Sequence, residues 1–160
     1  MQSRIVYRDV APGAVAAMHE VQRYVDHCEL EKSLLELVKL RASQINGCAY
    51  CVDMHSKDAR ALGESEQRLY AVTVWRAPFF TDRERAALTW TEAVTLVART
   101  GVPDEVYQLA CTQFSEKELV DLTMAIIAIN GWNRLAVGFR ALAGTYQPAV
   151  RTEAASGQWK

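Results

Sequence analysis

The sequence predicts a single all-α domain, and three observations support this fold class. Apolar residues recur at helical spacing along nearly the whole chain, as at Leu35, Val38 and Ala42, which share one face of a helix. Runs with the apolar–polar alternation of a β-strand are scarce. Finally, a Ser or Thr followed three residues later by Glu, the pattern of an N-terminal capping box, occurs several times.

The first two expected helices precede a central Asn-Gly pair. The helix over about residues 13–27 carries Val15 and Met18 at helical spacing. The next helix begins at Ser33, a candidate N-cap, and Glu36 completes an S-x-x-E capping box there. That box gives Glu36 a purely structural interpretation.

The Asn46-Gly47 pair then breaks the helical pattern. A third helix resumes at Cys48 and ends at Gly63, because glycine is the usual residue just past a helix C-terminus. A short helix over residues 65–76 follows, and the next proline ends it.

Three further helices have clear start signals. Thr81 with Glu84 and Ser115 with Glu118 match capping boxes, and the missing N–H of Pro103 is harmless in a first helical turn. The expected ranges are residues 81–100, 103–113 and 115–144.

The last helix has two unusual features. Asn130-Gly131 predicts a kink or an interruption within it. Its segment LTMAIIAI is hydrophobic all round, which predicts burial against other subunits as well as inside the domain. The domain is expected to cover residues 1–144, and residues 145–160 are polar and aperiodic, as in a flexible tail.

Composition restricts the class of protein. Half of the 160 residues are hydrophobic and the formal net charge is −1, which argues against nucleic acid or an anionic membrane as a partner. Neither a signal peptide nor a stretch of about 18 apolar residues is present. We therefore expect a soluble cytoplasmic protein. In a reducing compartment a C-x-x-C pair is catalytic or metal-binding rather than a static disulfide.

That pair lies in INGCAYCVDMH, residues 45–55. If a helix begins just after Gly47, Cys48 lies at its start and Cys51 lies in its first turn. Unpaired N–H groups and the positive end of the helix dipole then favour the thiolate form. Lowering a thiol pKa by about two units from its usual value near 8.5 would make it mostly ionised at neutral pH.

Two further residues complete a candidate catalytic arrangement. His55 lies one helical turn after Cys51 on the same face. If the two helices fold back across Gly47 as an antiparallel hairpin, Glu36 lies within about one turn of His55. Glu36 would orient His55, His55 would accept the proton of Cys51, and Cys48 would resolve oxidised Cys51 as a disulfide.

A metal site is the alternative interpretation of the same residues. Zinc prefers four ligands, and Cys48, Cys51, His55 and Glu36 can nominally supply them. However, no second C-x-x-C or H-x-x-x-H motif is present. Among the other side chains, Cys111 is expected to be a buried small hydrophobe, and Cys28 is either a core residue or a spare thiol. Surface or capping roles are expected for His19 and His27, and core or interface positions for Trp75, Trp90 and Trp132.

The complete motif resembles that of a known family. The pattern is E-x11-C-x-x-C-x3-H, formed by Glu36, Cys48, Cys51 and His55 and followed by Ala59 and Gly63. It is similar to the core of the AhpD-like alkylhydroperoxidases of the carboxymuconolactone decarboxylase superfamily. The resemblance implies an all-helical fold, assembly as dimers, trimers or hexamers, and a peroxidase whose second cysteine attacks the hydroperoxide.

One position departs from the family pattern. The best-known members have a histidine immediately before the second cysteine, where this chain has Tyr50. With its usual pKa near 10, tyrosine is not a base at neutral pH, but its hydroxyl can donate a hydrogen bond or hold water. The proton relay would then run through His55 and Glu36.

These observations predict a thiol-dependent peroxidase that reduces organic hydroperoxides. No flavin, haem or nucleotide motif is present, so no cofactor is expected and an external thiol or dithiol must supply the electrons. The alternatives are a disulfide oxidoreductase or redox sensor with weak peroxidase activity, and a metal-stabilised or structural oligomer.

Overall fold

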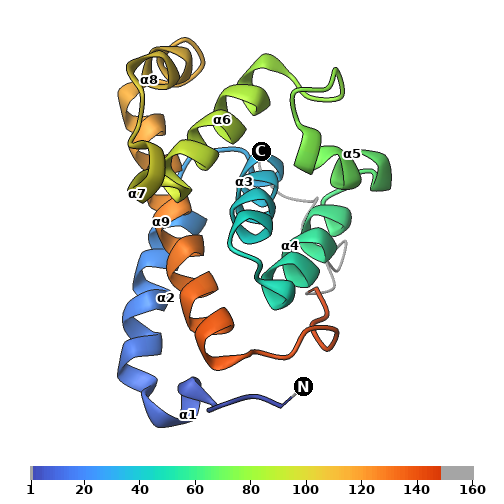
Figure 1. The fold of residues 1–160 in the computed structure, drawn as a ribbon, viewed down its shortest axis with the longest axis vertical. Helices are drawn as coiled ribbons and strands as arrows, with labels where there is room; N and C mark the ends of the chain where they lie inside the picture. Colours follow the sequence, from blue (N-terminus) through green and yellow to red (C-terminus); the bar gives the residue numbers. More distant parts are fainter. Residues whose placement is uncertain (1, 149–160) are drawn as a thin grey trace, which may run out of the picture.

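The computed structural model describes residues 2–148 and has the all-α fold that the sequence predicts (Figure 1). No β-strand occurs within this range. The predicted tail lies outside the described residues from position 149 onward. The helical elements are α1 (Tyr7–Val10), α2 (Pro12–Asp26), α3 (Lys32–Ile45), α4 (Ala49–Ala61), α5 (Glu66–Ala71), the 3₁₀ helix η1 (Val72–Val74), α6 (Asp82–Thr95), α7 (Val97–Thr100), α8 (Asp104–Cys111) and α9 (Glu116–Phe139).

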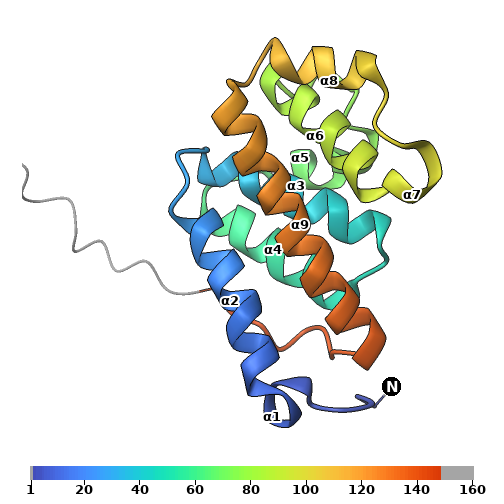
Figure 2. The same ribbon diagram turned by 90° about the vertical axis from the view of Figure 1, so that its left-hand side faces the viewer.

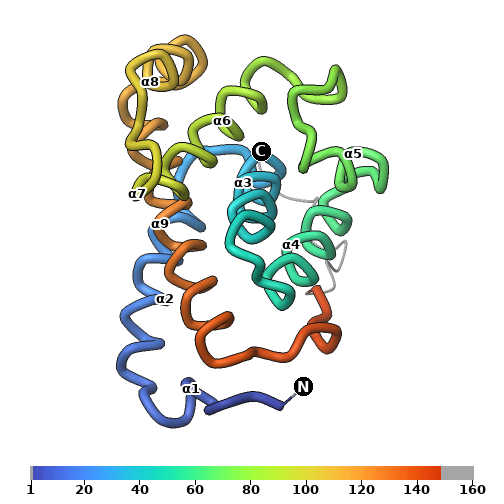
Figure 3. Tube along the Cα trace, in the orientation of Figure 1, coloured from blue at the N-terminus to red at the C-terminus, as the bar shows by residue number. Residues whose placement is uncertain are grey.

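Helix α3 lies at the centre of the fold. It packs against α4, α6 and α9, and α2 lies along α9 (Figures 1 and 2). The N-terminal segment runs beside the end of α9 (Figure 3), where the Arg4 N–H donates a hydrogen bond of 3.0 Å to the Phe139 carbonyl. Segments from both ends of the chain therefore meet near the start of α4.

The core divides into clusters on different faces of α3. Leu35 and Val38 pack with residues of α2, α6 and α9, including Ile126, whereas Leu37 and Leu40 face α5, η1 and α6. All five are at most 2% exposed, and a fully buried aliphatic side chain contributes about 2 kcal/mol. Burial on several faces therefore fixes the position of α3, which carries one half of the candidate site.

Two predicted capping boxes are confirmed and one is wrong. The hydroxyls of Thr81 and Ser115 accept hydrogen bonds from the backbone N–H three residues later, at 3.2 and 3.3 Å, and both boxes are complete. Ser33 makes no such bond, because α3 begins one residue earlier with Glu31 in the N-cap position. Glu36 is instead turned inward and buried.

Helix α9 is continuous through Asn130-Gly131, so the predicted interruption there is wrong. The Asn130 side chain donates to the Ile126 carbonyl, one turn earlier, at 2.9 Å and to the Thr95 hydroxyl at 3.1 Å. Gly131 allows α2 to approach, since a Cβ there would lie 2.7 Å from the terminal methyl of Met18. The Asn-Gly pair thus serves helix packing rather than chain reversal.

The predictions for isolated residues had mixed outcomes. Cys111 is exposed rather than buried, because its neighbour Ala110 is the residue of α8 that faces the core. His27 is exposed, with Nδ1 2.7 Å from the Arg23 carbonyl, and Trp75 is buried, as expected. No described helix combines the length and apolar character needed to cross a bilayer.

Candidate active site

The turn between α3 and α4 places the two cysteines. Gly47 adopts a positive φ of 66°, a conformation that glycine allows without steric cost. Cys48 is the N-cap of α4, and its sulfur accepts a hydrogen bond from the Cys51 N–H at 3.3 Å. Both cysteines are 1% exposed, and they form a disulfide with their Cα atoms 5.3 Å apart. The predicted position at a helix start is confirmed.

A polar network fixes this turn against α9. The Asn46 amide donates to the side-chain oxygens of Asn130 and Asn133 at 3.0 and 2.9 Å. Asn133 is 1% exposed and donates in turn to the Ser43 hydroxyl at 3.1 Å. Because buried amides need such partners, the network sets the position of the cysteine turn relative to α9.

The antiparallel hairpin brings Glu36 of α3 to His55 of α4, as predicted. A carboxylate oxygen of Glu36 lies 2.8 Å from His55 Nδ1, and both residues are buried. A carboxylate only accepts hydrogen bonds, so Nδ1 carries the proton and Nε2 is left as the acceptor of the neutral ring. Nε2 has no hydrogen-bond partner among the described residues.

Lys39 is part of the same cluster and was missed by the sequence analysis. It lies one turn after Glu36, is 8% exposed, and its ammonium lies 2.9 Å from the second Glu36 oxygen. Burial by itself would raise the pKa of Glu36, but the hydrogen bond and charge of His55, together with Lys39, outweigh burial and hold this pKa below its usual range. Glu36 is therefore ionised at neutral pH.

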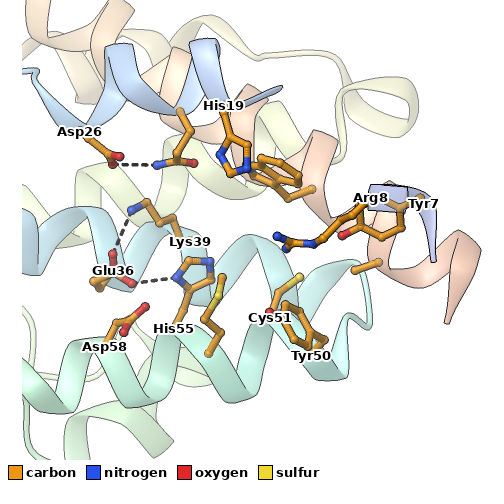
Figure 4. Close-up of a pocket in the computed structure, with 14 residues that line it drawn as sticks. Tyr7, Arg8, His19, Asp26, Glu36, Lys39, Tyr50, Cys51, His55 and Asp58 are labelled. Atoms are coloured by element: carbon orange, nitrogen blue, oxygen red, sulfur yellow. Dashed lines mark hydrogen bonds and ion pairs between the residues drawn. The ribbon is translucent and has the colours of Figure 1, made fainter. Parts of the chain in front are cut away.

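A cavity of about 330 Å³ opens over this cluster (Figure 4). Its walls come from α1, α2, α3, α4 and α9, and they include His55, Trp132 and Cys51. Cys48 is not part of the lining. Of the two cysteines, Cys51 is thus the one that a small molecule in the cavity can meet.

The segment after α9 returns to α4 beside the site. The Tyr146 hydroxyl donates to Asp58, which lines the cavity, at 2.7 Å. Burial raises the pKa of Tyr146, and so does this hydrogen bond to Asp58. The Lys57 ammonium also binds the Tyr146 carbonyl, at 2.9 Å. These contacts lie within the region predicted as a tail, and they are not visible in a sequence pattern because they join residues 88 or more positions apart.

Tyr50 and the metal alternative also have defined positions. Tyr50 is half-buried on the cavity wall, and its hydroxyl makes no hydrogen bond to the described residues. Glu36, His55 and Asp58 each offer one ligand atom within 4.8 Å of the others. However, the Lys39 ammonium already lies against Glu36, so a metal ion there would meet a like charge.

Together these features define an all-helical protein with a redox-capable C-x-x-C centre beside a buried Glu-His-Lys cluster. The model of the carboxymuconolactone decarboxylase family matches residues 11–93, and the chain belongs to that family. This confirms the AhpD-like resemblance of the sequence motif.

Individual relatives agree with this assignment. YdfG of Bacillus subtilis, an uncharacterised protein, is 39% identical over 138 residues, which are 86% of this chain and 94% of YdfG. A crystal structure of a protein of unknown function from Agrobacterium tumefaciens, described as a candidate antioxidant defence protein AhpD, is 46% identical. It has a TM-score of 0.88 and covers 91% of this chain and 100% of its own. The debrominase Bmp8 shares the fold, with a TM-score of 0.75 at 18% identity over 84% of this chain and 73% of its own.

Proposed function

We propose that this protein is a thiol-dependent peroxidase that reduces organic hydroperoxides through Cys51 and Cys48. One observation carries the proposal: Cys51 and buried His55 line the same cavity, and His55 Nε2 has no hydrogen-bond partner among the described residues. A thiolate nucleophile and a proton acceptor on one small-molecule cavity are the two groups that peroxide reduction needs.

The first step begins from the reduced pair. His55 Nε2 accepts the Cys51 thiol proton, and Glu36 stabilises the imidazolium through Nδ1. The N-terminal end of α4, which Cys48 caps, favours the thiolate further. The Cys51 thiolate attacks the distal oxygen of the hydroperoxide and the O–O bond breaks. Cys51 becomes a sulfenic acid, and the departing alkoxide takes the proton from His55.

The second step forms the disulfide. The Cys48 thiol condenses with the Cys51 sulfenic acid and releases water. The two cysteines are joined as a disulfide with their Cα atoms 5.3 Å apart, so the folded chain accommodates the product of this step. An external thiol or dithiol then reduces the disulfide by exchange and carries away the two electrons. A reducing cytoplasm, where we place the protein, supplies such donors.

Burial favours a small substrate over a protein disulfide. With 1% exposure, Cys51 is reached through a cavity of about 330 Å³, too small for another protein's disulfide loop. This supports peroxidase activity over the disulfide oxidoreductase alternative. The position of Lys39 argues against the metal-stabilised alternative.

Stopped-flow oxidation of the reduced protein by cumene hydroperoxide tests the proposal. We expect Cys51→Ser to lose turnover. Cys48→Ser should undergo one oxidation and accumulate a sulfenic acid on Cys51, detectable by mass spectrometry after dimedone trapping. Cys111→Ser is the matched control, because this exposed thiol is not part of the cavity lining. Full turnover by Cys51→Ser, or faster reaction of the wild type with oxidised glutathione than with the hydroperoxide, would refute the proposal.

We also infer that the protein forms homo-oligomers through α9. Val120 and Ile127, two helical turns apart on α9, are 58% and 50% exposed, and exposed apolar faces of this kind mark subunit contacts. Sedimentation velocity at micromolar concentration should show a dimer or larger assembly, which Ile127→Asp should weaken. A wild-type monomer would contradict the inference.

A further inference from the structure

We propose that Arg8 selects substrates that carry an anionic group, such as a carboxylate, and binds that group while the hydroperoxide lies at Cys51. This inference rests on the proposed peroxidase function and names its substrate class. Arg8 comes from the four-residue helix α1 and lines the same cavity as Cys51. Figure 4 shows its side chain extending from α1 toward the centre of the cavity.

Arg8 has no ion-pair partner among the described residues. Its guanidinium makes neither a salt bridge nor a side-chain hydrogen bond to them, and its one aromatic contact is with the neighbouring Tyr7 ring, whose centroid lies 5.9 Å away. The Lys39 ammonium, the other lysine or arginine charge on the cavity, is paired with Glu36. Arg8 is thus the cation of the cavity wall that remains available to a ligand.

The acidic groups of the cavity do not neutralise Arg8. Asp26 accepts from Gln22 at 2.8 Å, Asp58 accepts from Tyr146, and Glu36 is held by Lys39 and His55. All three acids lie at one end of the cavity, whereas Arg8 lies toward the end that holds Cys51 and Tyr50 (Figure 4). The charge of the cavity is therefore divided, with the unpaired positive group near the nucleophile.

The cavity walls between Arg8 and the acidic end indicate what kind of body the anionic substrate has. Met54, Trp132 and Ala136 line the cavity with apolar and aromatic surface, which suits a hydrocarbon or aromatic body. Guanidinium has a planar fork of donors that matches a carboxylate with two parallel hydrogen bonds. His55 Nε2 is buried and has no hydrogen-bond partner within residues 2–148, so it can accept the thiol proton and return it to the departing alkoxide.

Two hydroperoxides that differ only in charge test the inference. Cumene hydroperoxide and its para-carboxylate derivative are compared by kcat/KM in the wild type, Arg8→Gln and Arg8→Lys. Because a charge-assisted hydrogen bond is at stake, we expect Arg8→Gln to lower the preference for the carboxylate about tenfold or more. With the neutral substrate, kcat/KM should fall less than with the carboxylate, because the neutral substrate has no anionic group for Arg8 to bind. Arg8→Lys should retain part of the preference, and salt should weaken it because the site is open to solvent.

The control and the binding arm separate this inference from the proposed function. Arg99→Gln removes the same charge from an exposed arginine that is not part of the cavity lining, and it should leave the preference unchanged. Binding of 4-isopropylbenzoate, which has no peroxide, can be followed in oxidised protein by tryptophan fluorescence, because Trp132 lines the cavity. Arg8→Gln should weaken this binding about tenfold or more even if no peroxidase activity is found. Equal loss for both hydroperoxides, or unchanged binding of 4-isopropylbenzoate, would overturn the role of Arg8.

Discussion

Replacing Lys39 with Met tests whether the buried cluster depends on this cation. The ammonium lies 2.9 Å from Glu36, and the two side chains are 10% and 11% exposed. At an effective dielectric constant near 20, two charges at that separation attract by about 6 kcal/mol before desolvation is subtracted. Loss of one partner of a buried pair costs about 3–5 kcal/mol net. We expect a loss at the lower end of this range, because His55 still holds Glu36.

The same substitution should change the dependence of stability on pH. The pKa of Glu36 in the folded protein lies below its ordinary value near 4.5. Its contribution to stability is therefore complete above that value, and it is lost as the pH falls through the folded pKa. Without Lys39, burial is opposed by His55 alone and the pKa of Glu36 rises. The difference between wild type and Lys39→Met should be largest at neutral pH and shrink below about pH 4.5.

Urea unfolding of the oxidised protein at pH 7 and at pH 4 measures both effects. Arg23→Met is the control, since Arg23 pairs with Glu20 within one turn of α2 but the two side chains are 60% and 66% exposed. Such a pair should contribute about 1 kcal/mol or less. The double variant Glu36→Gln/Lys39→Met should lose less stability than the sum of the two single variants, because it leaves no unpaired charge.

Two outcomes would refute this reasoning. One is a Lys39→Met variant whose free energy of unfolding lies within about 0.5 kcal/mol of wild type at pH 7, the range of an ordinary surface substitution. The other is strict additivity in the double variant. Either would mean that Lys39 is solvated in solution and that Glu36 is held by His55 alone.

Two further substitutions test contacts of α9. Asn133→Leu should lower the free energy of unfolding by about 1–3 kcal/mol, because it leaves the buried Ser43 hydroxyl without its amide partner. It should also slow disulfide formation by loosening the turn that Asn46 anchors. Unchanged stability in urea would contradict this role. Gly131→Ala should change the free energy of unfolding by less than about 1 kcal/mol in thermal or urea unfolding. The gain in helix propensity should offset the cost of displacing the flexible Met18 methyl. A loss above about 2 kcal/mol would show that α2 cannot adjust.

Local signals in the sequence predicted much of the fold. The capping boxes at Thr81 and Ser115 act within one helical turn, so the sequence contains everything that they need. The capping box predicted at Ser33 does not form, although its S-x-x-E sequence is the same as that at Ser115. Glu36 instead contacts Lys39 on the same helix and His55 across the hairpin, and these contacts outweigh a local cap.

Some contacts of the candidate site could likewise be predicted from the sequence, and others could not. The Glu36–His55 contact could be predicted because a hairpin of known rise joins them through a short turn. The contact of Lys39 with Glu36 could also have been predicted, since residues three apart on a helix are neighbours and Glu36 was already a candidate catalytic acid. By contrast, Arg8 and Tyr146 reach the site only through tertiary packing. No periodic pattern indicates that a side chain from a very short helix or from the segment after α9 lies beside the cavity.

The origin of the cavity walls has a consequence for how members of this family can diverge. The matched family segment, residues 11–93, contains the glutamate, both cysteines and the histidine, but Arg8 precedes it and Trp132 and Tyr146 follow it. The candidate reactive groups thus lie in one continuous block of the sequence, while the walls of the cavity come partly from the two flanks. Exchange of the flanks between relatives should transfer substrate preference and leave the redox chemistry in place.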